Sequence, residues 1–509
     1  MKLFAAIDVG SYEVGMKIFE LSKKNGVREI DYIRHRIDLG TDSYNTGKIS
    51  YERMDELINV LKGFKEIMDS YRVDSYRAYG TSAIRETDNT GVILDQIRLR
   101  TTLAVSPLSN SEQRFLDYKS VALKSENFHN IIDKGTAFVD IGGGSTQVSL
   151  FSSSKLMSTV NIRLGILRLK DALNELTPTS ANYGRLLSEM IDNEIHHLKK
   201  IYLKKFHIEN IIVVDDHLPY LYRDLSKKAA GESFVSAEEF LSFTEKLRKM
   251  SEEQISKEVG IPRESSSLLI SSAYIIKHMR QAMDADKIYV PGVSLSDGIA
   301  YDYAEKNRII RSDHDFEQDI VSSVENISAR YKGGQNAGNL LSKSALAVFD
   351  GMRKHHGIDI RGRLLLQIAA RLRDVGCFIS LSSPEESAYS IIMGTEIIGL
   401  SHIEREMVAL IVTSSYKKTV SFEEVRESGF DEKSFLTVMK LTAILRLASG
   451  MIRSHNRKYD AVKAQIKEKE LIITVDTADD ISLEKGLFFE KSGLFEEVFG
   501  IRPVLRKKV

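Results

Sequence analysis

One segment of the sequence occurs twice. Residues 6–19 align without a gap on residues 138–151. In both copies an apolar run ends in aspartate, glycine and serine follow, and apolar residues then return at alternate positions. A period of two is typical of strands, so each copy predicts a β-hairpin whose loop carries Asp, Gly and Ser. A repeated unit of this kind restricts the chain to folds with two related halves.

Helical patterns lie between and after the two copies. Residues 51–71 place their apolar side chains on one face, and Ser50 is suited to cap the start of that helix. Residues 186–203, 237–259 and 266–285 also have helical periodicity. Strands that alternate with helices predict an α/β fold in each half.

Strand patterns fade after about residue 315. Residues 316–450 are almost wholly helical in pattern, and residues 364–381 are apolar enough for one buried helix. A strand pattern returns at residues 471–475. We therefore expect four regions: a first α/β half over 1–125, a second over 126–312, a helical domain over 313–455 and a small α+β piece over 456–509.

The composition limits the classes of partner. The 509 residues include 71 Lys and Arg and 71 Asp and Glu, so the chain has no net charge that would attract DNA. The single cysteine excludes an intramolecular disulfide framework and a zinc site built from cysteines. Asp8 interrupts the apolar start of the chain, which predicts a buried strand, no membrane partner and a cytoplasmic location.

The two predicted hairpin loops are suited to bind phosphate. Gly142, Gly143, Gly144 and Ser145 form one loop, and Gly10 and Ser11 form the other. Loops of this kind present backbone N–H groups that bind anions. Asp8 and Asp140 stand at the start of these loops and would repel phosphate unless a cation lay between them, which predicts Mg²⁺.

This pattern resembles the phosphate loops of the actin-like ATPase superfamily. Residues 80–89, 140–146, 164–169 and 291–298 further resemble, in order and spacing, motifs of the Ppx/GppA family of exopolyphosphatases and guanosine pentaphosphate phosphatases. The resemblance implies a duplicated actin-like, ribonuclease H-like fold followed by a helical HD-like domain. It also implies a Mg²⁺-dependent phosphohydrolase that releases the terminal phosphate of inorganic polyphosphate or of guanosine pentaphosphate.

The resemblance assigns roles and also exposes departures. It gives Arg85 a phosphate contact, which suits a guanidinium. Gln113 stands where the family has its catalytic glutamate, with Glu112 beside it, and Gln147 replaces a second family glutamate. An amide cannot take a proton from water, although a glutamine can orient the attacking water. Gln113 or Glu112 would then place that water.

Two other interpretations stay open. The glutamines at 113 and 147 also suit a non-catalytic sensor that binds polyphosphate or a guanosine alarmone. An actin-like kinase would need a glycine-rich adenosine pocket, and residues 214–217 (Val-Asp-Asp-His) argue against one.

The helical region resembles an HD domain that has lost its metal ligands. Asn336 and Arg373 stand where imidazoles are needed, and Asp374 alone is no metal site. The region would then serve for packing, for formation of a homodimer or for polymer binding.

Overall fold

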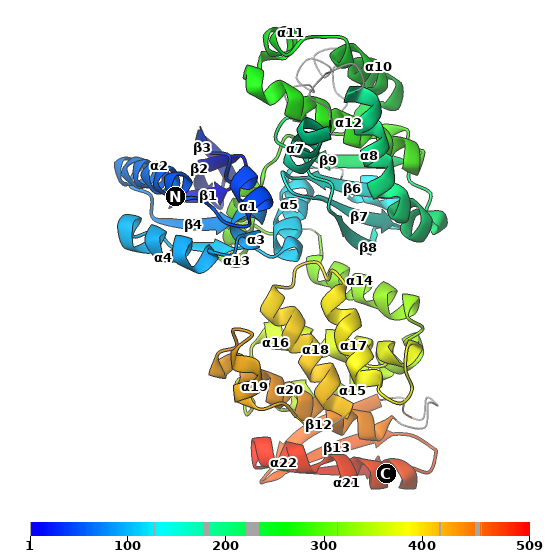
Figure 1. Cartoon of the computed structure of the whole chain (residues 1–509). Coiled ribbons are helices and arrows are strands. Elements are labelled where there is room, and N and C mark those ends of the chain that lie inside the picture. Colours follow the sequence, from blue (N-terminus) through cyan, green and yellow to red (C-terminus); the bar gives the residue numbers. More distant parts are fainter. Residues whose placement is uncertain are drawn as a thin grey trace. The chain divides into compact units, whose positions relative to one another are not determined.

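The protein consists of two compact units, Met1–Asp315 and Phe316–Val509. The structure, a computed structural model, describes residues 2–125, 128–176, 183–219, 234–312, 314–416, 419–452, 459 and 461–508. Figure 1 shows two sheets with their helices in the first unit, and a helical bundle with a small sheet in the second.

The first unit contains two sheets of matching topology. The first consists of β1 (Lys2–Val9), β2 (Glu13–Ser22), β3 (Gly26–Arg36), β4 (Ser75–Gly80) and β5 (Val105–Pro107), in the order β3-β2-β1-β4-β5. The second consists of β6 (Thr136–Ile141), β7 (Thr146–Ser152), β8 (Lys155–Ile162), β9 (Asn210–Val214), β10 (Phe234–Ser236) and β11 (Lys287–Tyr289), in the order β10-β11-β9-β6-β7-β8.

The strand pairing repeats as well. β1 pairs antiparallel with β2 and parallel with β4, and β6 pairs antiparallel with β7 and parallel with β9. The two predicted hairpins are therefore confirmed, and they occupy equivalent places in the two sheets.

The helices of the first unit are listed by their bounds. They are α1 (Leu39–Thr46), α2 (Tyr51–Tyr71), α3 (Ser82–Glu86), α4 (Thr90–Thr101), α5 (Asn110–Lys124), α6 (Phe128–Asp133), α7 (Ile166–Leu176), α8 (Tyr183–His197), α10 (Ala237–Arg248), α11 (Glu252–Ile255), α12 (Ser266–Met283) and α13 (Leu295–Lys306). π-helical turns follow α8 at Leu198–Tyr202 and α11 at Ser256–Gly260, and short 3-10 turns cover Leu203–Lys205 and Arg263–Ser265. The Ser50 hydroxyl caps α2 as predicted, because it accepts a hydrogen bond from the Arg53 N–H.

Helices cover both faces of the first sheet. One face of β1 and β2 packs against α2, α3 and α4 in a single apolar cluster. On the other face Phe4 and Phe19 pack with Leu116 of α5 and with Ile299 of α13. Although α13 follows the second sheet in sequence and falls within the predicted second half, it therefore packs into the core of the first.

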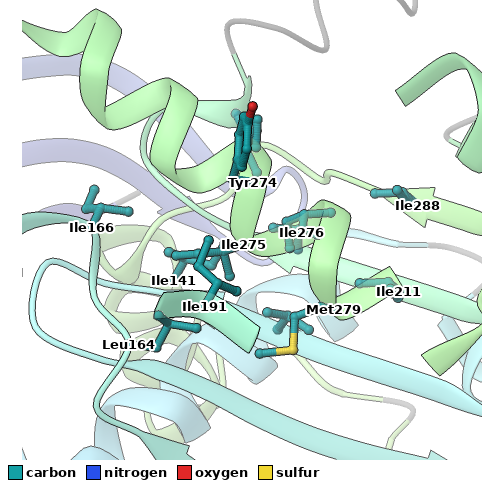
Figure 2. Packing of buried hydrophobic residues seen from close by; sticks show 14 of the residues in the cluster. Ile141, Leu164, Ile166, Ile191, Ile211, Tyr274, Ile275, Ile276, Met279 and Ile288 are labelled. Atoms are coloured by element: carbon teal, nitrogen blue, oxygen red, sulfur yellow. The ribbon is translucent and has the colours of Figure 1, made fainter. Parts of the chain in front are cut away.

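The second sheet has a larger core. Ile141, Ile211 and Ile288 project from its strands onto α8 and α12, where they meet Ile191 and Met279 (Figure 2). The other face contacts α5 again, because the Tyr118 ring lies against the rings of Phe138 and Phe151. Helix α5 thus packs on both sheets, which places its side chains between them.

The second unit begins as a helical bundle and ends in a sheet. Its helices are α14 (Phe316–Arg330), α15 (Gln335–Gly351), α16 (Ile360–Leu372), α17 (Pro384–Gly394), α18 (His402–Tyr416), α19 (Phe422–Arg426), α20 (Glu432–Met451), α21 (Ser482–Lys491) and α22 (Gly493–Phe499), with a 3-10 turn at Val375–Phe378. The strands β12 (Ala461–Lys467), β13 (Glu470–Asp476) and β14 (Arg502–Lys507) form a sheet in that order. Helix α20 is long and apolar enough to span a membrane by length and composition, and 56% of that stretch is buried in the structure.

Two predicted helices are wrong. The expected helix over 237–259 is interrupted at residues 249–251, because Ser251 caps a new helix, α11. We expected a single buried helix over 364–381, but α16 ends at Leu372. The chain then forms a 3-10 turn, and Ile379 and Leu381 are exposed. Gly376 explains the break, because a Cβ there would lie 1.8 Å from the Pro384 carbonyl oxygen, so the chain approaches α17 too closely for a continuous helix.

Candidate active site

Asp8 and Asp140 occupy equivalent positions in the two sheets. Asp8 lies near the end of β1, opposite Gly15 of β2, and Asp140 lies near the end of β6, opposite Gln147 of β7. Burial, and then the charges of Asp216, Glu13 and Asp140, raise the pKa of Asp8 well above its ordinary value. The duplicated fold therefore brings the two predicted metal ligands into one electrostatic cluster.

Helix α5 adds a third carboxyl group that we did not predict. Asp117 is buried, and its carboxyl group interacts with that of Asp140. Burial, and then the charges of Asp140, Asp8 and Asp216, raise the pKa of Asp117. Asp117 and Asp140 thus form a buried carboxyl pair, in which burial and the neighbouring negative charges disfavour ionisation of Asp117.

The residues at the start of α5 have a different role. Ser109 and Glu112 form a capping box: the Ser109 N–H donates to Glu112 Oε2 at 3.0 Å, and the Glu112 N–H donates to Ser109 Oγ at 3.2 Å. This arrangement uses the Glu112 carboxylate to begin the helix. Gln113 is half-buried on the same helix, and Asp117 lies one turn further along, so residues 113 and 117 share a helix face.

Arg114 connects α5 with the second hairpin. Its side chain is fully buried, and its Nε donates to Gln147 Oε1 at 2.7 Å. Burial raises the pKa of Asp140, the Arg114 guanidinium lowers it, and the charges of Asp216 and Asp215 raise it. Gln147, which replaces a family glutamate, therefore serves here as an acceptor for a buried arginine.

The two glycine loops have the same turn. The Gly10 N–H donates to the Glu13 carbonyl oxygen at 3.0 Å, and the Gly142 N–H donates to the Ser145 carbonyl oxygen at 2.9 Å. Glycine is needed at position 10, because a Cβ there would lie 2.6 Å from that carbonyl oxygen.

The loops also lie against each other. A Cβ on Gly143 would lie 3.1 Å from the Ser11 Cβ, and a Cβ on Gly144 would lie 2.6 Å from the Tyr44 hydroxyl oxygen. The Ser11 hydroxyl is hydrogen-bonded to Tyr44 at 2.7 Å and to Ser82 at 2.9 Å. The glycines of the second loop therefore allow the two halves to approach closely.

Three successive backbone N–H groups of the second loop are not used by the fold itself. Within the part of the chain that the structure describes, the backbone N–H groups of Gly143, Gly144 and Ser145 donate to no protein acceptor. The carbonyl groups of Gly142 and Gly143 instead accept hydrogen bonds from the first turn of α7. Such a run of N–H groups is typical of phosphate-binding loops.

Arg85 lies on α3, close to the start of α5. Its Nη1 donates to the Leu108 carbonyl oxygen at 2.7 Å, and its Nη2 lies 3.9 Å from a carboxylate oxygen of Glu86. Glu86 also pairs with Arg168 of the second half at 2.6 Å. A direct contact of Arg85 with phosphate stays a prediction.

A cleft of about 370 Å³ contains Glu13 and Asp216, two residues whose charges act on Asp8. It is lined by Tyr12, Glu13, Lys17, Glu29, Tyr32, Arg34, Asp215, Asp216, His217, Pro219, Ile261, Pro262, Ser265, Gly292, Val293 and Ser294. Burial, and then the charge of Asp216, raise the pKa of Glu13 to about 7, although Arg34 lowers it. Over the described residues, the cleft therefore combines four acidic side chains and two basic ones, Lys17 and Arg34, with aromatic and apolar walls.

The adjacent aspartates Asp215 and Asp216 differ in role. Asp215 Oδ1 accepts from the N–H groups of His217 and Leu218 at 2.7 and 2.6 Å, and its Oδ2 accepts from the Ser272 hydroxyl at 2.7 Å. Asp215 thus holds the turn after β9. Asp216 is exposed in the cleft and contributes charge to the cluster.

The residues of the cluster fit Mg²⁺. Asp8 Oδ1 is buried and has no hydrogen-bond partner among the described groups. No three His, Cys, Asp or Glu side chains in the described ranges are close enough together to enclose a metal ion by themselves. Mg²⁺ suits such a site, because it commonly takes one or two carboxylates and completes its shell with water and substrate phosphate.

The predicted remnant of an HD site lies in the second unit. Asp374 Oδ1 accepts from Arg373 Nη1 and from the Tyr416 hydroxyl, both at 2.7 Å. The side chain of Asn336 lies outside the described residues. Loss of an HD metal site therefore stays a prediction.

Sequence reasoning missed Arg114 and Asp117. Both lie on α5, directly or shortly after Gln113. For Asp117 the available signal was its spacing from Gln113, because residues four apart lie on the same face of a helix. Their burial depends on the packing of α5 between two sheets, which local sequence does not specify.

Comparisons with known proteins agree with this architecture. Residues 22–307 match the model of the Ppx/GppA phosphatase family, and residues 321–491 match the model of domain III of Ppx/GppA phosphatases. The crystal structure of an exopolyphosphatase from Cytophaga hutchinsonii superposes with a TM-score of 0.53 at 20% identity, over 60% of this chain and 98% of that one. The duplicated actin-like fold is thereby confirmed.

Curated relatives cover the chain to different extents. The guanosine-5'-triphosphate,3'-diphosphate pyrophosphatase of Vibrio atlanticus is 19% identical over 87% of this chain and 86% of its own length. Exopolyphosphatase 1 of Mycobacterium tuberculosis is 23% identical over 37% of this chain and 54% of its own length. The bifunctional 3-dehydroquinate synthase/phosphatase of Fusobacterium nucleatum is 23% identical, and the match spans only 26% of that protein. With the two matched models covering most of the sequence, the chain belongs to the Ppx/GppA phosphatase family.

Proposed function

We propose that the protein is a Mg²⁺-dependent phosphohydrolase that releases the terminal phosphate of inorganic polyphosphate or of guanosine pentaphosphate. The observation that carries this proposal is the pair Asp8 and Asp140, which the duplicated fold places in one buried cluster beside two glycine loops. Named relatives supply the substrate classes, since one acts on a guanosine nucleotide and another is an exopolyphosphatase.

In this proposal the chain positions phosphate between charges of opposite sign. The N–H groups of Gly143, Gly144 and Ser145 bind the terminal phosphate, and Gly10 and Ser11 shape the facing loop. Asp8 and Asp140 hold Mg²⁺, which when bound offsets the charge of the phosphate oxygens. Arg85 adds a guanidinium contact at the end of α3.

Asp117 gives the site the carboxyl group that Gln113 and Gln147 lack. It lies one helical turn beyond Gln113 and touches Asp140. Gln113 orients the attacking water. Asp117 lies within the same cluster, and a cation bound at Asp140 would lower the raised pKa of Asp117, so that its carboxylate can accept the proton of that water. Glu112 is a weaker candidate for either role, because its carboxylate caps α5.

The acidic cleft restricts how a polyanion can enter. Glu13, Asp215 and Asp216 line it, and a phosphate chain would be repelled there without cations. Substrate is therefore expected to enter as its Mg²⁺ complex, and phosphate release should depend on the Mg²⁺ concentration even at saturating substrate.

A second candidate is a non-catalytic sensor that binds polyphosphate or a guanosine alarmone. The observation that favours it is Gln147, whose amide oxygen is fixed by buried Arg114. An amide in this place cannot act as a base, so a site of this kind could retain binding after loss of turnover.

Phosphate release by the purified chain separates the two candidates. The measurement compares polyphosphate and guanosine pentaphosphate at matched Mg²⁺, for the wild type and for Gln113→Glu. An enzyme should release phosphate. The added carboxylate should raise the rate by one to two orders of magnitude, out of the ~10²–10⁴-fold that a general base supplies. Binding of either substrate with no release by the wild type would favour the sensor.

A further inference from the structure

A second cavity, of about 620 Å³, lies wholly within the second unit. It opens where the ends of α18 and α20 meet the turn before α15, the segment after α16, and α21. Its lining is Lys332, Gly333, Gly334, Ala337, Leu341, Arg373, Asp374, Cys377, Leu381, Ser415, Tyr416, Ser449, Gly450, Ile452, Leu487 and Lys491. Its volume falls in the range of small-molecule sites, about 300–1,000 Å³.

The charges that line this cavity are unbalanced. Lys332, Arg373 and Lys491 face a single acid, Asp374, whose Oδ1 lies 2.7 Å from Arg373 Nη1. Neither Lys332 nor Lys491 forms an ion pair with any residue that the structure describes. Counted over the residues that the structure describes, the lining therefore has an excess of two positive charges, in a chain whose total charge is zero. An anion would offset this excess.

The opposite part of the lining is apolar. Leu341 and Ile452 are buried, Leu487 is half-buried and Leu381 is 85% exposed at the rim. The Arg373 guanidinium covers the Tyr416 ring, with its Cζ 4.1 Å from the ring centroid. The Tyr416 hydroxyl donates to Asp374. This stack holds the guanidinium in place beside the apolar wall. A ligand that contacts both the basic and the apolar parts of the lining needs an anionic end and a flat or apolar end.

The backbone before α15 fixes the position of Lys332. Lys332 and Gly334 both have positive φ, 51° and 70°. Gly333 between them has no room for a side chain, because a Cβ would lie 2.7 Å from Ser328 Oγ. The Gly333 N–H also donates to the Ser328 carbonyl oxygen at 2.8 Å, so the turn that carries Lys332 is held against the end of α14.

We propose that this cavity binds an organic phosphate of the size of a nucleoside diphosphate. The phosphates would lie at Lys332, Lys491 and Arg373, and the base would lie against Leu341, Ile452 and Leu487. The site is separate from the hydrolytic cluster of the first unit, so the proposal does not rest on the proposed function.

Calorimetric titration of the full chain with GDP in EDTA tests the proposal. Without a divalent cation the acidic cleft of the first unit repels phosphates, whereas the basic cavity needs no metal. We expect one GDP bound per chain by the wild type, and binding at least about tenfold weaker in Lys332→Glu/Lys491→Glu. Lys343→Glu on α15 is the matched control, because Lys343 is exposed and lies outside the cavity. Its affinity should stay within about twofold of wild type.

Three results would overturn the proposal. The first is no GDP binding by the wild type, and the second is equal GDP binding by the double variant. The third is binding of pyrophosphate as tight as that of GDP, because this would show that the apolar wall takes no part in binding. Thermal unfolding of each variant checks its fold. If the charge-reversed variant Lys332→Glu/Lys491→Glu is unfolded, the neutral variant Lys332→Gln/Lys491→Gln takes its place. Phosphate release with Mg²⁺, measured on the same samples, reports the proposed function separately.

Discussion

At the scale of single residues, Asp117 and Gln113 should be separable by mutation. Asp117 touches Asp140, whereas Gln113 lies one turn away and is half-buried. We expect Asp117→Asn to lower phosphate release by about 10²–10⁴, because an amide cannot accept a proton. Glu112→Gln is the control: a glutamine at this position of the capping box can still accept the Ser109 N–H, so the variant should keep the fold and most of the rate. A wild-type rate in folded Asp117→Asn would exclude Asp117 from the reaction.

Glu13 should make the stability of the first unit depend on pH. Its pKa in the folded chain is raised from 4.5 to about 7, chiefly by burial and then by Asp216. The folded chain therefore holds a proton that the unfolded chain has lost between pH 4.5 and 7, and stability falls as pH rises through that window.

Glu13→Gln should weaken this dependence, and the raised pKa values of Asp8, Asp117 and Asp140 should retain the rest of it. We expect its free energy of unfolding at pH 8, in EDTA, to exceed that of wild type by about 1 kcal/mol after allowing for solvent screening. Denaturant unfolding at pH 5 and pH 8 measures it. Equal pH profiles for the variant and the wild type would show that Glu13 titrates normally.

At the scale of elements, the hairpin loops depend on close backbone contact. A Cβ on Gly165 would lie 2.2 Å from the Gly143 carbonyl oxygen. Gly165→Ala should therefore displace the loop of residues 142–145, destabilise the first unit by about 1–3 kcal/mol and lower phosphate release. Gly63→Ala in α2 is the matched control, because no atom lies within 4 Å of its Cβ, and it should stabilise by about 0.5–1 kcal/mol. Similar effects of the two substitutions on unfolding would contradict this packing.

The elements also show what local sequence can predict. The hairpins and helix α2 follow from periodicity and capping at Ser50, because their signals lie within each segment. The expected helix over 364–381 failed because Gly376 packs against the Pro384 backbone, a contact between two elements. Asp8 and Asp140 were found through the repeat. Arg114 and Asp117 were missed because their burial comes from packing of α5 on both sheets.

At the scale of the whole molecule, the chain has two units with separate cores. Met1–Asp315 and Phe316–Val509 each bury their own apolar clusters, and the proposed Mg²⁺ site lies in the first alone. We expect two calorimetric unfolding transitions, of which Mg²⁺ raises only one. In Asp140→Asn that shift should disappear while the other transition stays in place. A single transition, or a shift of both by Mg²⁺, would contradict independent units.

Phosphate release by folded Asp140→Asn tests the central claim most directly. Asp140 is the residue on which the metal, the carboxyl pair with Asp117 and the second glycine loop converge. The measurement follows phosphate from polyphosphate and from guanosine pentaphosphate at matched Mg²⁺, with the fold verified by its thermal transitions. The proposal predicts release by the wild type and a loss of at least about 10² in the variant, because an amide binds Mg²⁺ poorly. Wild-type release by folded Asp140→Asn would contradict it.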